Sequence, residues 1–201
     1  MDDHTRPEFS RSALLTIDLQ RDFLDIPGTR AVLPAVRRLT AAFRAAGRPV
    51  VHVVRLYLPD GSNADLCRRA SPARGAVPGS AGSQLADGLG GELDHERLLA
   101  GQFQEFRPGE HAMYKPRWSA FYGTRLREHL RAAGVTTVVV AGCNYPNCPR
   151  STLVDATERD FRTVAVRDAI SGWAAAADRE LAGMGIACLP TADVLAGLGD
   201  S

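Results

Sequence analysis

The cysteine at position 148 stands where a short apolar run gives way to a helix-like pattern. Residues 138–142 (VVVAG) are too few for a helix and suit a buried strand, and a tight turn containing Pro146 follows them. Pro149 then occupies a plausible first helical position. A helix N-terminus favours an anion, and a cysteine there beside a cation can have a lowered pKa. The pattern therefore indicates a site for a thiolate nucleophile at Cys148, and a small buried side chain is the alternative.

The other cysteines give less indication of chemistry. Cys143, at the end of the apolar run, is typical of a small buried side chain. The four cysteines, at positions 67, 143, 148 and 188, are too sparse for a disulfide framework and lack the paired short spacings of a zinc site. A redox protein using Cys143 and Cys148 is an alternative, although their C-x4-C spacing differs from the C-x-x-C of thioredoxin-like proteins.

Two ionisable residues also follow strand-like runs. Asp18 ends the apolar segment 12–19, and Lys115 ends the segment 112–116. Lys115 is the single lysine among 24 basic residues, which suggests a position that requires a compact ammonium, although a leftover lysine in an arginine-rich chain is the alternative. The carboxyl ends of parallel strands share one edge of a sheet. We therefore expect an acid, an ammonium and a thiol to meet at that edge.

The order of the predicted elements indicates an α/β fold. Strands are expected at 12–19, 49–55, 112–116, 135–141, 161–167 and 186–189, and helices at 33–46, 124–133, after Cys148, at 174–182 and from 191. This alternation is typical of a parallel sheet covered on both faces. The segment 56–91 is expected to be a long loop, either a lid or plain surface, and His52 to be a satisfied core histidine.

Length and charge bound the class of protein. The 201 residues predict one domain, 1–201, with residues 1–10 as a flexible N-terminal segment. The net charge of +1 gives no reason to expect nucleic acid or an anionic membrane as partner. No apolar run approaches a membrane span, and the first residues lack the hydrophobic core of a signal peptide. A cytoplasmic protein acting on a small molecule is expected.

Four motifs, in order along the chain, carry a resemblance to a known family. They are D-x-Q-x-D-F at 18–23, K-x-R-x-S-A-F-x-G-T at 115–124, G-x5-C at 142–148 followed by Ser151 and Thr152, and FRTVAVRDA at 161–169. The sequence resembles the isochorismatase-like cysteine hydrolase family. The resemblance implies a three-layer, Rossmann-like fold with a parallel sheet of about six strands and helices on both faces. It also implies a homo-oligomer, a dimer or a tetramer.

The resemblance further implies a catalytic triad of Asp18, Lys115 and Cys148. It implies a cis peptide bond between Cys143 and Asn144, with the backbone N–H groups of Asn144 and Cys148 forming an oxyanion hole. Asp18 would accept the thiol proton, Cys148 would attack a carbonyl carbon, and Lys115 would keep both groups charged. The reaction would hydrolyse the C–N bond of a small amide, carbamoyl or ureido substrate through an acyl-thioester.

The chain departs from familiar family members at two places. Nicotinamidase-like members carry metal-binding histidines after the second strand, whereas 54–66 (VRLYLPDGSNADL) has none, so we expect neither metal nor cofactor. Tyr145 and Pro146 replace small residues before the nucleophile and are expected to reshape the pocket. The alternatives are a vinyl-ether hydrolase of the isochorismatase type, whose members lack the cysteine, and a non-catalytic binding protein.

Side chains near these motifs are candidate substrate contacts. The aromatic candidates are Phe23, Trp118 and Tyr145, and the candidates for a substrate carboxylate are Arg55, Tyr57 and Arg117.

Overall fold

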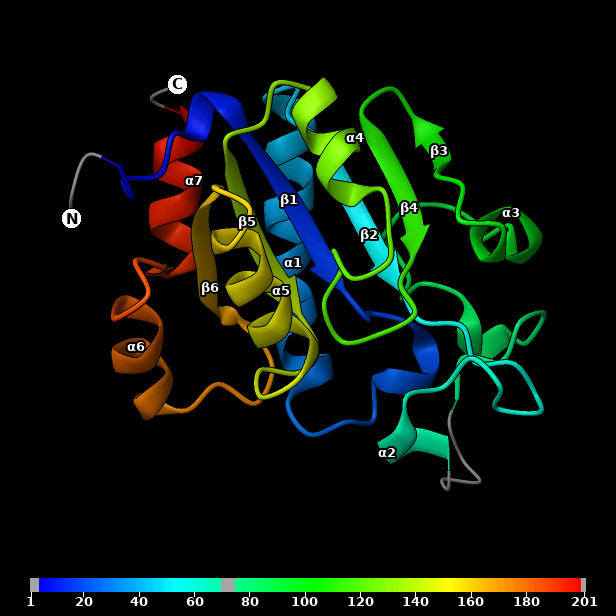
Figure 1. The fold of residues 1–201 in the computed structure, drawn as a ribbon. Coiled ribbons are helices and arrows are strands. Elements are labelled where there is room, and N and C mark those ends of the chain that lie inside the picture. The colour runs from blue at the N-terminus through cyan, green and yellow to red at the C-terminus, as the bar shows by residue number, and fades with distance from the viewer. Residues whose placement is uncertain (1–3, 70–74, 200–201) are drawn as a thin grey trace.

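A seven-stranded sheet forms the middle layer of the computed structural model, which describes residues 4–69 and 75–199 (Figure 1). The strands are β1 (Ser12–Ile17), β2 (Val50–Val54), β3 (Gln104–Arg107), β4 (Glu110–Tyr114), β5 (Thr137–Gly142), β6 (Arg162–Ile170) and β7 (Ala187–Leu189). Their order in the sheet is β3-β4-β2-β1-β5-β6-β7, and every neighbouring pair is parallel except β3 with β4.

Helices cover both faces of this sheet. They are α1 (Thr29–Ala45), α2 (Leu66–Arg69), α3 (His95–Leu99), α4 (Leu126–Ala132), α5 (Cys148–Thr157), α6 (Ala175–Ala182) and α7 (Thr191–Gly199). One core contains the buried side of α1 and residues of α7, and a second core contains residues of α4, α5 and α6. In Figure 1, α4 and α5 lie in front of the sheet and α1 lies behind it. The predicted three-layer α/β fold is confirmed.

The central strands are buried along their whole length, which explains their continuous apolar sequences. Every residue of β1, β2 and β5 is buried, as expected for parallel strands with helices on both sides. Gly142 at the end of β5 has a φ of 126°, and a Cβ there would lie 2.2 Å from the carbonyl oxygen of Ile17. Only glycine therefore allows β5 to pack this closely against β1.

The strand register brings three strand ends to one edge. Ile17 pairs with both Val53 and Gly142, and Val54 pairs with Tyr114. The residues that follow these strands therefore leave the sheet side by side. This edge is where the sequence predicted that Asp18 and Lys115 would meet the turn that carries Cys148.

Two elements differ from the sequence predictions. The first strand of the antiparallel pair, β3, was not predicted, because four residues at the sheet edge with alternating exposure carry little apolar signal. Helix α1 begins at Thr29, four residues before the predicted start, and Pro34 lies inside it. The other six strands are confirmed with small shifts at their ends.

The predicted long loop and N-terminal segment contain ordered contacts. Within 56–91, the described residues include α2 and a 3-10 helix, Ala81–Ser83, and Leu85 forms an isolated bridge with Gln20. The N–H of Glu8 donates to Thr137 Oγ1 over 2.9 Å, while residues 1–3 lie outside the described residues. No helix in the described ranges is both long and apolar enough to cross a bilayer.

His52 is a fully buried core histidine with both ring nitrogens bonded, as predicted. Its Nδ1 lies 2.7 Å from Thr16 Oγ1, and its Nε2 lies 2.9 Å from Glu110 Oε1. Burial lowers the pKa of His52, more than the hydrogen bond and charge of Glu110 raise it. Burial raises the pKa of the Glu110 carboxyl, but the hydrogen bonds and charges of His52 and Arg44 outweigh it and lower that pKa to about 2. The ring is therefore neutral, donating from Nε2 to Glu110 and accepting from Thr16 at Nδ1.

This cluster predicts a loss of stability in mild acid. Because the pKa of His52 is lower in the folded than in the unfolded chain, the unfolded chain binds more protons below pH 6.5, and the free energy of unfolding falls there. The Glu110 contribution is complete above the ordinary carboxyl pKa of 4.5 and is lost progressively as the pH falls from there to about 2. We expect a lower melting temperature at pH 5.5 than at pH 7.5, and a titration midpoint below 6.5 for the His52 ring in the nitrogen resonances of the folded protein. A titration midpoint near 6.5 for that ring would contradict this assignment.

Candidate active site

Asp18 and Lys115 form a buried ion pair at the carboxyl edge of the sheet. Lys115 Nζ lies 2.9 Å from Asp18 Oδ2 and 3.3 Å from the carbonyl oxygen of Arg117. Lys115 is 0% exposed and Asp18 is 5% exposed, so each charge depends on the other for compensation. Asp18 has a φ of 51°, a left-handed conformation that aspartate tolerates better than most residues. The second carboxylate oxygen, Oδ1, has no hydrogen-bond partner among the described residues.

Strand pairing fixes the backbone on both sides of this ion pair. The N–H of Asp18 donates to Val53 O over 2.9 Å, and the N–H of Lys115 donates to Val54 O over 3.0 Å. The side chain of Gln20 also joins the ends of β1 and β2. Its Oε1 accepts from the N–H of Arg55 over 2.8 Å, and its Nε2 donates to the carbonyl oxygens of Arg55 and Ser83, each over 2.7 Å. Gln20, a member of the D-x-Q-x-D-F motif, is a structural link beneath the site.

The Cys148 thiol faces these charges from the first residue of α5. Burial raises its pKa to about 12, the Asp18 charge adds to this rise, and Lys115 and Arg55 oppose it. The expectation of a lowered thiol pKa is therefore wrong. A helix N-terminus and two cations do not compensate for desolvation at a side chain that is 9% exposed and lies beside a carboxylate. The thiol is protonated at neutral pH and needs a base to become a nucleophile.

The turn before Cys148 is held by its backbone. The N–H of Cys143 donates to Ile17 O over 2.9 Å, and the N–H of Tyr145 donates to Ser171 O over 2.7 Å. No peptide bond in the described ranges is cis, so the expected cis bond between Cys143 and Asn144 is wrong. The trans form of a bond without proline is favoured by about 3 kcal/mol, and the turn is closed without the rarer form. The N–H groups of Asn144 and Cys148 have no protein acceptor in the part of the chain that the structure describes.

A narrow cavity of about 30 Å³ joins these groups. Asp18, Cys148 and Asn144 line it. Four of the six predicted substrate contacts line it as well: Phe23, Arg55, Tyr57 and Trp118. Ile26, Arg68, Cys143 and Asn147 line it too and were not predicted to do so. Only Asn147, next to the nucleophile, had a signal in the sequence that could have identified it.

The other two predicted contacts do not line this cavity. Tyr145 is buried, its hydroxyl donates to Glu180 Oε2 over 3.1 Å, and its ring packs edge-on against Trp173 at 4.9 Å. Tyr145 therefore fastens the turn to α6. Arg117 Nη1 donates to the carbonyl oxygens of Asn63 and Pro116, over 3.1 and 2.8 Å, and the residue lines a separate open groove.

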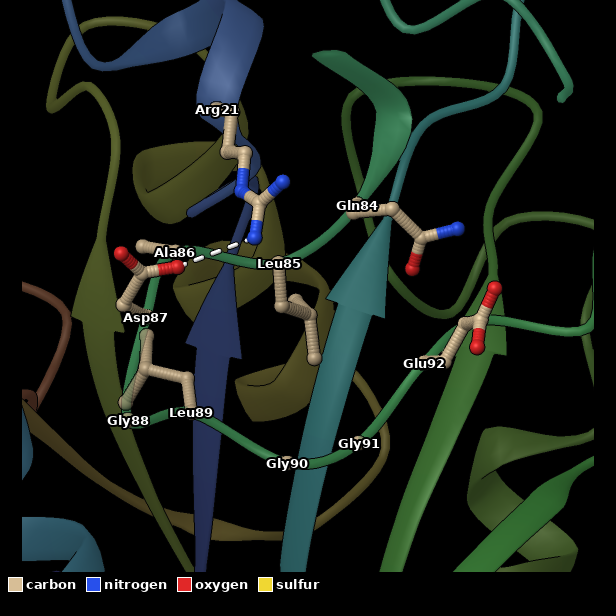
Figure 2. A pocket seen from close by; sticks show the side chains of 10 residues that line it. All are labelled: Arg21, Gln84, Leu85, Ala86, Asp87, Gly88, Leu89, Gly90, Gly91 and Glu92. Carbon is tan, nitrogen blue, oxygen red and sulfur yellow. Dashed lines mark hydrogen bonds and ion pairs between the residues drawn. The ribbon is translucent and has the colours of Figure 1, made fainter. Parts of the chain in front are cut away.

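A larger cavity lies under the glycine-rich loop after Leu85 (Figure 2). It has a volume of about 370 Å³, and Arg21 reaches across to Asp87 over 3.0 Å. Figure 2 shows this loop passing over β1 and β2, with Gly88, Gly90 and Gly91 along it. It shares no lining residue with the cavity at Cys148 and presents no nucleophile.

The donor set beside Cys148 does not fit a metal ion. The loop after β2, where the resemblance places the metal ligands of nicotinamidase-like proteins, carries Arg55 and Tyr57 in this chain. Although burial opposes its charge, Tyr57 and Asp18 raise the pKa of Arg55 above its usual value, so a permanent cation occupies the wall. Within the described ranges, no three His, Cys, Asp or Glu side chains are grouped to hold a metal.

Comparisons with known proteins agree with this geometry. The chain is 32% identical over 165 residues to a probable inactive nicotinamidase from Arabidopsis thaliana, covering 77% of each chain. It is 30% identical over 168 residues to the maleamate amidohydrolase of Pseudomonas putida, covering 80% of this chain and 72% of that protein. The solved N-carbamoylsarcosine amidase from Thermoplasma acidophilum aligns with a TM-score of 0.71 and 28% identity, over 90% of this chain and 96% of that one.

The family assignment follows from the match over nearly the whole chain. The model of the isochorismatase domain matches residues 12–194, from the first residue of β1 into α7. This range contains Asp18, Lys115, Cys148 and all seven strands. The chain belongs to the isochorismatase family.

Proposed function

We propose that this protein is a cysteine hydrolase that cleaves the C–N bond of a small amide, carbamoyl or ureido substrate through an acyl-thioester on Cys148. One observation carries the proposal: a protonated, buried thiol shares a cavity with a carboxylate that is ion-paired through Oδ2 and has no partner at Oδ1. Such a carboxylate can accept the thiol proton. Amide-hydrolysing relatives support the reaction class.

The first half of the reaction acylates the enzyme. Asp18 Oδ1 takes the thiol proton, the sulfur of Cys148 bonds to the carbonyl carbon, and the carbonyl oxygen gains the negative charge. The N–H groups of Asn144 and Cys148, which have no protein acceptor in the described ranges, stabilise that oxyanion. Asp18 returns the proton to the leaving nitrogen as the C–N bond breaks, which releases ammonia or an amine.

The second half releases the acid. Asp18 removes a proton from a water molecule, and the resulting hydroxide attacks the thioester carbonyl. The C–S bond then breaks, Asp18 returns the proton to the sulfur, and the Cys148 thiol and the carboxylic acid product are released. Lys115 holds the Asp18 carboxylate through Oδ2 during both halves, which leaves Oδ1 for proton transfer.

The alternatives from the sequence have less support. The vinyl-ether hydrolases of the family lack the nucleophilic cysteine that is present here. For a redox protein, Cys143 would need to react, yet it is buried, its pKa is raised by burial, and Thr29 Oγ1 donates to its sulfur over 3.3 Å. The Arabidopsis relative is a probable inactive nicotinamidase, but this chain retains Asp18, Lys115 and Cys148 in one site.

Ammonia release tests the proposed function. We expect the wild-type protein to release ammonia from a member of a panel of small primary amides, carbamoyl amino acids and ureides. The Cys148→Ala variant serves as the blank. Cys188→Ala is the matched control, which should retain activity because Cys188 lies in β7 and does not line the cavity. Equal release by wild type and Cys148→Ala would refute the proposal. A homo-oligomer and a cytoplasmic location stay predictions.

A further inference from the structure

Arg55, the first residue after β2, is a buried cation on the wall of the catalytic cavity. It is 3% exposed and shares this wall with Asp18 and Cys148. Its Nε and Nη2 donate to the Tyr57 hydroxyl over 3.1 and 2.7 Å, and Nη2 also contacts Asp65 Oδ2. Its Nη1 is buried and has no partner among the described residues. A buried N–H group without an acceptor is unfavourable, which indicates that a ligand supplies the acceptor.

The charges around the cavity favour an anionic acceptor. The Asp18 charge is paired with Lys115, and the Asp65 carboxylate is bonded to the opposite nitrogen of the Arg55 guanidinium. Arg68 from α2 lines the same cavity and adds a second positive charge to its wall. After these pairs are formed, the wall retains an excess of positive charge.

The fixed position of Arg55 makes it selective. Tyr57 and Asp65 hold two of its three nitrogens, and Gln20 bonds its backbone N–H and carbonyl, so its orientation does not depend on the ligand. With Nε and Nη2 occupied, Nη1 presents its N–H groups in a fixed direction, and a carboxylate oxygen can accept from them in a charge-assisted hydrogen bond.

We propose that Arg55 Nη1 binds a carboxylate of the substrate, so that the preferred substrates are amides that also carry a carboxylate group. This inference rests on the proposed function and names the substrate class of the same site. Arg55 is then the specificity-determining residue, and its cation stands where nicotinamidase-like proteins place metal ligands.

Matched substrates test this inference. The monoamides of malonic, succinic and glutaric acid each differ from the corresponding diamide only by a carboxylate in place of one carboxamide. We expect wild type to favour at least one monoamide over its diamide by about 10-fold or more in kcat/KM, the range of a hydrogen bond to a charged group. In Arg55→Met, the ratio of kcat/KM for the monoamide to that for the diamide should fall to within about threefold of unity, mainly because KM for the monoamide rises. Arg30→Met, which removes an exposed arginine paired with Asp25, should leave the ratio unchanged.

A binding measurement separates this inference from the proposed function. In the Cys148→Ala background, calorimetry should show that Arg55→Met weakens binding of the preferred monoamide by about 10-fold or more and changes diamide binding little. This result would support Arg55 even if no hydrolysis occurred. Three results would each overturn the inference. Wild type could prefer the diamides, no monoamide could bind, or the preference for the monoamide over its diamide could survive in Arg55→Met. If Arg55→Met does not fold, Arg55→Lys replaces it in the kinetic test. This variant should lower the kcat/KM ratio of monoamide to diamide at least about threefold, and an unchanged ratio would overturn the inference about Arg55.

Discussion

Replacing Asp18 by asparagine should lower kcat at pH 7 by about 1000-fold or more, because the buried thiol then loses its base. The pKa of Cys148 is raised to about 12 by burial and by the Asp18 charge. At pH 7 a thiol with that pKa is ionised in about one molecule in 10⁵. The asparagine removes the smaller cause of the rise and leaves burial, so the thiol still resists ionisation.

The pH dependence of this variant distinguishes a lost base from a distorted site. Because the remaining activity depends on the thiolate fraction, kcat/KM of Asp18→Asn should rise about tenfold per pH unit between pH 7 and 9. Wild type, which transfers the proton to Asp18, should not show this slope. Asp25→Asn, an exposed carboxylate paired with Arg30, is the matched control and should retain full activity. If Asp18→Asn kept more than a tenth of wild-type activity, Asp18 would not be the base.

Replacing Lys115 by methionine should damage both stability and turnover. The lysine is fully buried, and its Nζ lies 2.9 Å from Asp18 Oδ2. Its removal leaves a buried carboxylate without a counter-charge, which costs about 3 to 5 kcal/mol of unfolding free energy. The same loss of a fixed positive charge should lower kcat by about 100-fold or more.

A double variant separates the two effects of Lys115. In Asp18→Asn with Lys115→Met the unpaired charge is absent, so urea unfolding should show higher stability than for Lys115→Met alone, while activity stays lost. Equal stability of the single and double variants would show that the ion pair does not account for the role of Lys115.

The sequence was sufficient to predict how the catalytic edge is built. The apolar runs that end at Asp18, Lys115 and Gly142 are β1, β4 and β5, and the parallel register brings their ends together. Continuous apolar strands and amphipathic helices are strong local signals. The edge strand β3 and the exact start of α1 lacked such signals.

Local sequence did not predict the electrostatics of the site. The pKa of Cys148 depends on how completely other segments bury it, and its neighbours along the chain suggested the opposite direction. Tyr145 and Arg117 lie within the motifs at 142–148 and 115–124, yet Tyr145 bonds Glu180 and Arg117 bonds backbone carbonyls. The unpartnered Nη1 of Arg55 likewise results from the arrangement of Tyr57 and Asp65 around it.

The most direct test of the central claim is to capture the acyl group on Cys148. A wild-type reaction with an active amide should be quenched during turnover and analysed by mass spectrometry. Trypsin places both turn cysteines in one peptide, residues 132–150, so Cys143→Ala is needed to locate the adduct. We predict an added mass equal to the substrate less the released amine, present in wild type and in Cys143→Ala. An adduct or steady turnover in Cys148→Ala would contradict the account.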